Sequence, residues 1–283
     1  MASVRYSRTL LTVLMIPSGL WAGWEPFNKN HGPFDPNSWP TRFNLHRCDS
    51  VRAEGSPGSG VRAITCCQIA DRPSAPKVYA YSRPKEAGAW LIVTDRHDHT
   101  VGGPAEISRP LCTFDDVYWA DLNADGREDF VIETPLGGCG TIYTFCCHVT
   151  FVLSEGDRYF ITTTTGLWSG LAYFVDANGD GVCEFIHTAF VEGSHVKGRD
   201  GRGHKYWVYT LLAIRQGRLV VDKRLVPGFP KWIWYTHRAN HEATTQITRA
   251  QQRKLWAEQA DRVFWRPKKV VDGKANEATG GDV

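Results

Sequence analysis

Two short segments carry oxygen-donating side chains at alternating positions. The first reads DLNADGREDF at 121–130, and the second reads DANGDGVCEF at 176–185. At positions 1, 3, 5 and 9, each offers three carboxylates and one amide, and such like charges repel one another unless a cation lies among them. Oxygen donors without nitrogen or sulfur suit Ca²⁺. The candidate side-chain ligands are Asp121, Asn123, Asp125 and Asp129 in the first segment and Asp176, Asn178, Asp180 and Glu184 in the second.

The spacing separates these segments from EF-hand loops. An EF-hand ends its loop with a bidentate Glu at position 12 and continues as a helix. Position 12 is Ile132 in the first segment and His187 in the second, and runs typical of β-strands follow. We therefore expect ligation by positions 1, 3, 5 and 9, with a backbone carbonyl from position 7, which is Arg127 or Val182. The glycine at position 6 permits the sharp turn between them.

The neighbourhood of the two segments repeats as well. Asp176 follows Asp121 by 55 residues. An aromatic, apolar approach precedes each loop (VYWA, LAYFV), a β-type run follows it (DFVIE, EFIHT), and a hairpin-like pair of runs comes later. Repetition at such a period indicates one supersecondary unit per repeat. The segment 77–94 reads as another hairpin, and the run before it keeps only Asp71 where a loop would be, so we expect an earlier unit without the cation.

The two loops resemble the calcium loops of FG-GAP and VCBS repeats, the blades of integrin-α-type β-propellers, whose pattern D-x-[DN]-x-D-G-x-x-[DE] precedes an apolar strand. The resemblance covers 117–133 and 171–188. It implies a mainly all-β fold of propeller-like blade repeats, about three to four units, with structural Ca²⁺ and a role in adhesion or ligand binding. A clear Phe-Gly…Gly-Ala-Pro stretch is missing ahead of both loops.

The ends of the chain differ from its β-rich middle. Residues 1–22 have basic residues, a short apolar run and then small residues, the order of a cleaved secretory signal, although an organelle transit peptide also fits. We expect the β repeat domain at 23–243, a C-terminal amphipathic helix at 244–267 and a disordered tail at 268–283. Eight cysteines follow the leader, which in a secreted or periplasmic protein predicts disulfide bonds.

Composition narrows the classes of partner. A net charge of +3 in 283 residues gives no reason to expect nucleic acid, and no apolar stretch after the leader is long enough for a membrane helix. We expect an exported calcium-stabilised binding or interaction protein with a carbohydrate or protein ligand. The alternative is a carbohydrate-active enzyme, a polysaccharide hydrolase or lyase, on the same scaffold.

Two histidine motifs offer weaker metal sites. DRHDH at 95–99 places two His near an Asp, but a solvated loop after a hairpin is the preferred interpretation. HRANHE at 237–242 has His at zinc spacing without the Glu of an HExxH motif.

Overall fold

Strands dominate the computed structural model, and the prediction of a mainly β protein is confirmed. The structure describes residues 43–51, 62–69, 71–82, 89–108, 116–135, 147–166, 171–191, 197–199, 201–203, 206–222, 233–235 and 248–266.

Twelve of the strands form three successive antiparallel groups of four, each in chain order. The first group is β3 (Arg62–Gln68), β4 (Lys77–Ser82), β5 (Ala89–Thr94) and β6 (Thr100–Ser108). The second is β7 (Asp116–Ala120), β8 (Asp129–Pro135), β9 (Cys147–Glu155) and β10 (Arg158–Gly166). The third is β11 (Phe174–Val175), β12 (Glu184–Val191), β13 (Tyr206–Arg215) and β14 (Arg218–Val221). The repeat expected from the loops thus corresponds to a repeated four-strand topology.

The first two groups are joined into one ten-stranded sheet. The junction is a parallel contact of β6 with β10, with Tyr159 opposite Gly102. Two short strands, β1 (His46–Arg47) and β2 (Asp49–Val51), extend the sheet beside β7 and β3. The third group is a separate sheet, and β15 (Ile233–Tyr235) pairs with its long strand β13.

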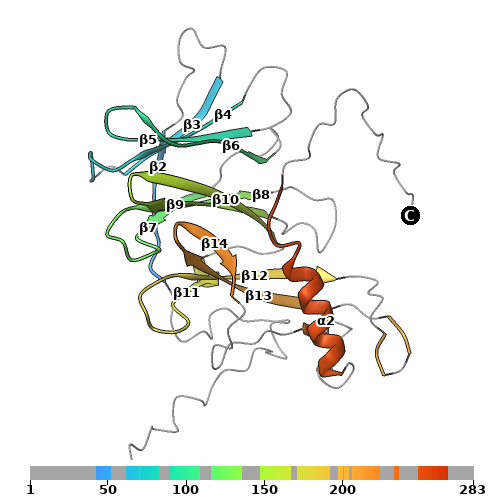
Figure 1. Cartoon of the computed structure of the whole chain (residues 1–283). Helices are drawn as coiled ribbons and strands as arrows, with labels where there is room; N and C mark the ends of the chain where they lie inside the picture. Colours follow the sequence, from blue (N-terminus) through green and yellow to red (C-terminus); the bar gives the residue numbers. More distant parts are fainter. Residues whose placement is uncertain are drawn as a thin grey trace, which may run out of the picture.

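The three groups lie one above another, with the second in the middle (Figure 1). The middle strands alternate between two cores: Phe130 and Ile132 pack toward the first group, while Val131 and Phe151 pack toward the third. Because successive side chains on a strand point to opposite faces, a nearly continuous apolar run such as DFVIE fits a strand that is buried on both sides. Figure 1 shows β11–β14 below this layer and β2–β6 above it.

One short α-helix, α2 (Arg249–Ala260), is present in the described part of the chain, inside the range 244–267. Thr248 caps its N-terminus with a capping box to Gln251, which satisfies two otherwise free backbone N–H groups. Leu255 is buried, and the Trp256 indole N–H donates to the Tyr209 carbonyl of β13 at 3.2 Å. No helix among these residues has the length and apolarity needed to cross a membrane.

The segment after α2 continues along the edge of β10. The Thr165 N–H donates to the Val263 carbonyl at 3.0 Å, and the Trp265 N–H donates to the Thr163 carbonyl at 2.9 Å. Val263 is fully buried in the core between the second and third groups. This segment therefore ties the end of the described chain to the middle group.

The expected signal peptide at 1–22 and the expected disordered tail at 268–283 lie outside the described residues and stay predictions. Four cysteine side chains are described, and all carry free thiols: Cys48, Cys66, Cys67 and Cys183. The other four cysteine side chains lie outside the description, so the disulfide bonds stay a prediction.

Candidate metal centre

The two acidic segments occupy the same place in successive groups. Residues 121–128 connect β7 to β8, and residues 176–183 connect β11 to β12, so each loop joins the first strand of its group to the second. In the first group, this place is taken by the turn between β3 and β4, which contains Asp71 and Arg72.

In the first loop, the side chains fold back onto the loop's own backbone. Asp121 accepts the N–H groups of Asp125 (3.0 Å) and Gly126 (2.8 Å), and Asn123 accepts the N–H of Asp125 at 3.1 Å. Asp125 in turn accepts the N–H of Arg127 at 2.9 Å. The position-9 carboxylate of Asp129 accepts the N–H at position 2, Leu122, at 2.8 Å. The four side chains are thereby gathered around one tight turn.

The second loop repeats this pattern position by position. Asp176 accepts the N–H groups of positions 5 and 6 at 3.0 Å each, and Asn178 accepts the N–H of Asp180 at 2.9 Å. Asp180 accepts the N–H of Val182 at 2.9 Å, and Glu184 accepts the N–H of Ala177 at 2.8 Å. The two loops therefore share one internal geometry although only some of their residues are identical.

Positions 4 and 6 of both loops have positive φ angles. They are Ala124 (60°) and Gly126 (83°) in the first loop and Gly179 (76°) and Gly181 (80°) in the second. Glycine adopts this left-handed conformation without steric cost, as the sequence pattern at position 6 requires. Arg127 and Val182, whose backbone carbonyls are the expected ligands at position 7, follow directly after the position-6 glycines.

A serine that sequence analysis missed anchors the first loop. Ser154 on β9 is fully buried, and its hydroxyl lies 2.8 Å from both the Asp125 and Asp129 carboxylates, while its backbone N–H donates to Asp129 at 2.6 Å. By strand register, the equivalent position beside Glu184 on β13 is Ile214. The longer Glu184 instead accepts the Asn178 amide at 3.2 Å.

Both position-9 carboxylates are buried without a compensating charge. Asp129 is fully buried and Glu184 is 1 % exposed, and neither forms an ion pair within the described residues. Desolvation is the main cause that raises the pKa of Asp129 to about 7, and it likewise raises the pKa of Glu184 to about 7. The neighbouring carboxylates Asp125 and Asp180 add to these shifts. A cation in either loop would relieve this cost.

The two loops also contact each other. The Cys183 N–H, at position 8 of the second loop, donates to the Leu122 carbonyl of the first at 2.8 Å. Leu122, Cys183 and Val182 pack in the same core. A change of conformation in one loop is therefore coupled to the other through backbone and core.

The donor set fits a calcium ion by its chemistry. Each carboxylate oxygen that accepts one N–H keeps a second lone pair, so the loop hydrogen bonds leave acceptor capacity for a cation. Among the described residues, however, no group of three or more His, Cys, Asp or Glu side chains is arranged to hold a metal ion. The side-chain oxygens of each loop are instead close in the chain and accept hydrogen bonds from backbone N–H groups.

The DRHDH segment forms the turn between β5 and β6. Asp95 accepts the N–H groups of His97 and His99, and Asp98 pairs with Lys77 at 2.9 Å. These contacts account for the turn, with both His side chains exposed. The HRANHE segment lies outside the described residues.

Comparisons with models of protein families, with curated proteins and with solved structures found no match to this chain.

Proposed function

We propose that this chain is an exported binding or interaction protein whose β fold is stabilised by one Ca²⁺ in each of the two acidic loops. The observation that carries the proposal is the shared geometry of the loops. Two segments with the same hydrogen-bond pattern and the same positive-φ positions join the first and second strands of successive groups. In each of them a buried carboxylate lacks a countercharge among the described residues.

The ligands in this proposal are the side chains at positions 1, 3, 5 and 9 and the carbonyl at position 7. The ion would add to the free lone pairs of carboxylates that the loop already holds together. It would also neutralise the buried Asp129 or Glu184. If free calcium exceeded the dissociation constant about a hundredfold, each site would add about 2.7 kcal/mol to the free energy of unfolding.

The four-strand groups support an architecture of three propeller-like units, of which the first two share one ten-stranded sheet. Each group is an antiparallel meander, as a propeller blade is, and the groups stack face to face (Figure 1). Secretion or delivery to the periplasm is proposed from the leader, and N-terminal sequencing of the mature protein tests it.

Thermal unfolding with and without chelator tests the calcium proposal. Asp125→Ala in the first loop and Asp180→Ala in the second each remove one ligand, while Asp157→Ala removes an exposed carboxylate from the β9–β10 turn. We expect chelator to lower the melting temperature of the wild type and of Asp157→Ala. The two loop variants should melt lower in calcium and respond less to chelator. A melting temperature that calcium leaves unchanged would overturn the proposal.

A further inference from the structure

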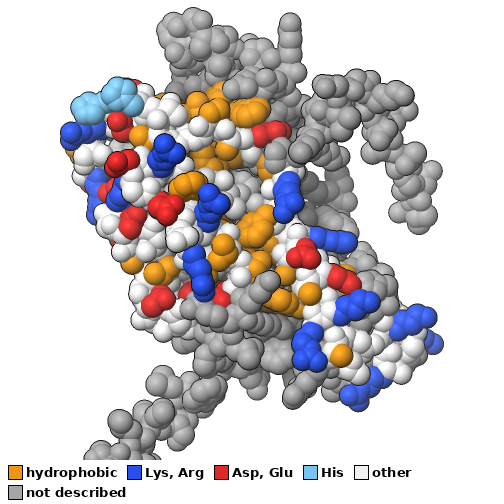
Figure 2. All heavy atoms as spheres, in the orientation of Figure 1, with side chains coloured by type: hydrophobic (Ala, Val, Ile, Leu, Met, Phe, Trp, Pro, Cys, Tyr) orange, Lys and Arg blue, Asp and Glu red, His pale blue; other side chains and the backbone are white. Residues whose placement is uncertain are grey.

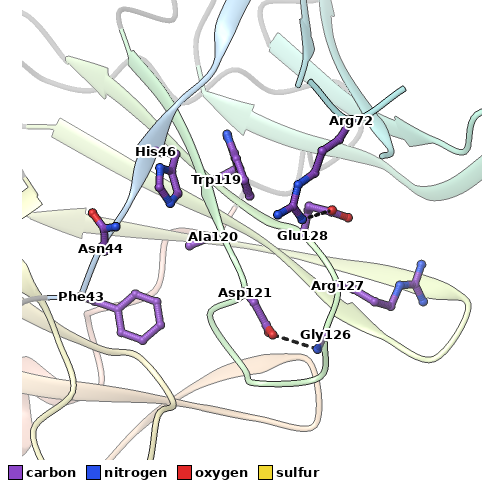
Figure 3. A pocket seen from close by; sticks show the side chains of 10 residues that line it. All are labelled: Phe43, Asn44, His46, Arg72, Trp119, Ala120, Asp121, Gly126, Arg127 and Glu128. Carbon is purple, nitrogen blue, oxygen red and sulfur yellow. Dashed lines mark hydrogen bonds and ion pairs between the residues drawn. The ribbon is translucent and has the colours of Figure 1, made fainter. Parts of the chain in front are cut away.

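A cavity of about 350 Å³ adjoins the first acidic loop. Its walls come from three separate parts of the chain: the segment around β1, the turn between β3 and β4, and β7 with the loop that follows it. Figure 3 shows Phe43, Asn44 and His46 on one side, Trp119 in the centre and Arg72 with Glu128 on the other. The volume lies at the lower end of the range for small-molecule sites, about 300–1,000 Å³.

The central indole is already covered. The His46 ring stacks on Trp119 with centroids 4.8 Å apart, and the Arg72 guanidinium carbon lies 4.7 Å from the centroid of Trp119. Figure 3 places Trp119 between these two side chains. A ligand would therefore meet the edges of this stack, which carry hydrogen-bonding groups, rather than the open face of an aromatic ring.

Of the two arginines that line the cavity, Arg72 is the one beside Trp119. Its Nη1 donates to Glu128 Oε1 at 2.7 Å, with the Arg72 side chain 51 % exposed and that of Glu128 18 % exposed. A guanidinium has five N–H donors in a fixed fork, so this single bond leaves others for an anion. Arg127 does not compete, because it turns away in Figure 3 and lies over the Tyr159 ring at 5.2 Å.

The neutral and apolar lining groups suit a ligand with hydroxyls, while Asp121, a second carboxylate of the lining, accepts the backbone N–H groups of Asp125 and Gly126. The Asn44 and His46 side chains are exposed and can donate and accept, and the Glu128 carboxylate can accept further hydrogen bonds. Phe43 adds an apolar surface. A simple anion would use only Arg72, whereas one acidic sugar ring would use the charge, the neutral groups and the apolar edge.

We propose that this cavity binds a uronic acid residue of an anionic glycan, with Arg72 bound to the sugar carboxylate. The inference rests on the proposed binding function and names its ligand class. Figure 2 shows one face of the molecule, on which separated Lys and Arg side chains lie among Asp and Glu without a broad basic surface.

Calorimetric titration of the calcium-loaded full chain tests the proposal. The probes are oligogalacturonates and oligoglucuronates of three units, their neutral galactose and glucose counterparts, sodium sulfate and a glutamate-rich peptide. We expect at least one uronate series to bind, with the neutral counterpart weaker by about tenfold or more, because a charge-assisted hydrogen bond is lost. Failure of both uronate series, equal binding of the neutral sugars, or stronger binding of sulfate or the peptide would overturn it.

Substitutions of Arg72 test whether its guanidinium binds the sugar carboxylate. Arg72→Gln should abolish uronate binding, and Arg72→Lys should retain an intermediate affinity because it keeps the charge without the fork. Arg218→Gln is the matched control, since Arg218 lies over Phe160 at 5.2 Å outside the cavity. Binding that survives Arg72→Gln contradicts the assignment.

Melting curves of each variant with calcium and with chelator keep the two proposals apart. A variant that retains the calcium response but not uronate binding is folded. If the wild type responds to calcium but binds neither uronate series, the cavity assignment fails and the calcium proposal stands.

Discussion

At the scale of single residues, Ser154 holds the first acidic loop against β9. Its hydroxyl lies 2.8 Å from the carboxylates of Asp125 and Asp129, and its backbone N–H donates to Asp129 at 2.6 Å. Ser154 reaches Asp129 from 25 residues away, through the register of β8 with β9. The position-9 carboxylate of this loop is therefore held from a neighbouring strand as well as from its own turn.

Ser154→Ala tests how far the first loop depends on its anchor. The change removes the one O–H donor that lies within hydrogen-bonding distance of both carboxylates in a buried site, which should lower the free energy of unfolding by about 1–3 kcal/mol. It should also weaken the calcium response of the first loop. Ser74→Ala, in the exposed β3–β4 turn, is the control and should change stability by less than about 0.5 kcal/mol in chemical denaturation. Equal stability of the two variants would rule out the anchoring role.

His187 gives a pH dependence separate from the loops. Burial is the main cause that lowers its pKa from 6.5 to about 4, and its Nε2 is hydrogen-bonded to the Thr165 carbonyl while Nδ1 is buried without a partner. The neutral ring is therefore stable in the fold, whereas the unfolded chain takes up a proton below pH 6.5. His187 therefore does not lower the free energy of unfolding above pH 6.5. Between pH 6.5 and about pH 4 it lowers the free energy of unfolding by up to about 1.4 kcal/mol per pH unit, because only the unfolded chain is protonated there.

Denaturation between pH 4.5 and 7.5, with chelator present so that calcium release does not contribute, measures this effect. The raised pKa values of Asp129 and Glu184 act in the opposite direction over this range, so the effect of His187 is read from the difference between variant and wild type. Relative to the wild type, His187→Gln should become more stable as the pH falls below 6.5, while the exposed His97→Gln should follow the wild type. Identical pH profiles for His187→Gln and the wild type would show that another group is responsible.

At the scale of elements, hairpins and loops follow from local signals. The runs at 77–94 form β4 and β5, joined in antiparallel register from Lys77 opposite Thr94 to Ser82 opposite Ala89. Alternation and turn residues suffice for such pairs, because their partners are close in the chain. The parallel contact of β6 with β10 has no local signal, since the two strands are far apart in sequence and Tyr159 opposite Gly102 is the one pair of their register.

Two turn glycines test how closely the second and third groups approach. Gly156 (φ 56°) and Gly217 (φ 61°) occupy the β9–β10 and β13–β14 turns. A Cβ added at Gly217 would lie 2.8 Å from Glu155 Cβ and 2.9 Å from Phe160 Cδ2, whereas one added at Gly156 would have no neighbour within 4 Å. Each alanine carries the left-handed backbone cost of about 1–2 kcal/mol, but only Gly217→Ala adds overpacking.

Gly217→Ala should therefore be less stable than Gly156→Ala by about 1–3 kcal/mol in chemical denaturation. The shared positive φ makes Gly156→Ala the control for backbone strain. If the two variants unfold at the same denaturant concentration, the close contact between these groups does not exist in solution.

At the scale of the whole molecule, three stacked groups form two cores, with the middle group contributing to both. The acidic loops contact each other and sit against the core that joins the second and third groups. If the loops bind calcium as we propose, its removal should therefore loosen the interface between these groups before it affects the core of the first.

The spacing of the two loops predicts a repeated unit. The side chains at positions 1 to 9 of each loop could be singled out because all come from one short segment, whereas Ser154 could not, because it depends on the register of β8 with β9. The order in which the groups stack could not be predicted from the sequence, because it depends on contacts between distant strands.

The number of calcium ions bound per chain is the most direct measure of this account. Elemental analysis after dialysis against a low free calcium concentration should find two ions per chain in the wild type and one in either Asp125→Ala or Asp180→Ala. Wild-type protein that retains no calcium, or loop variants that retain as much as the wild type, would contradict it.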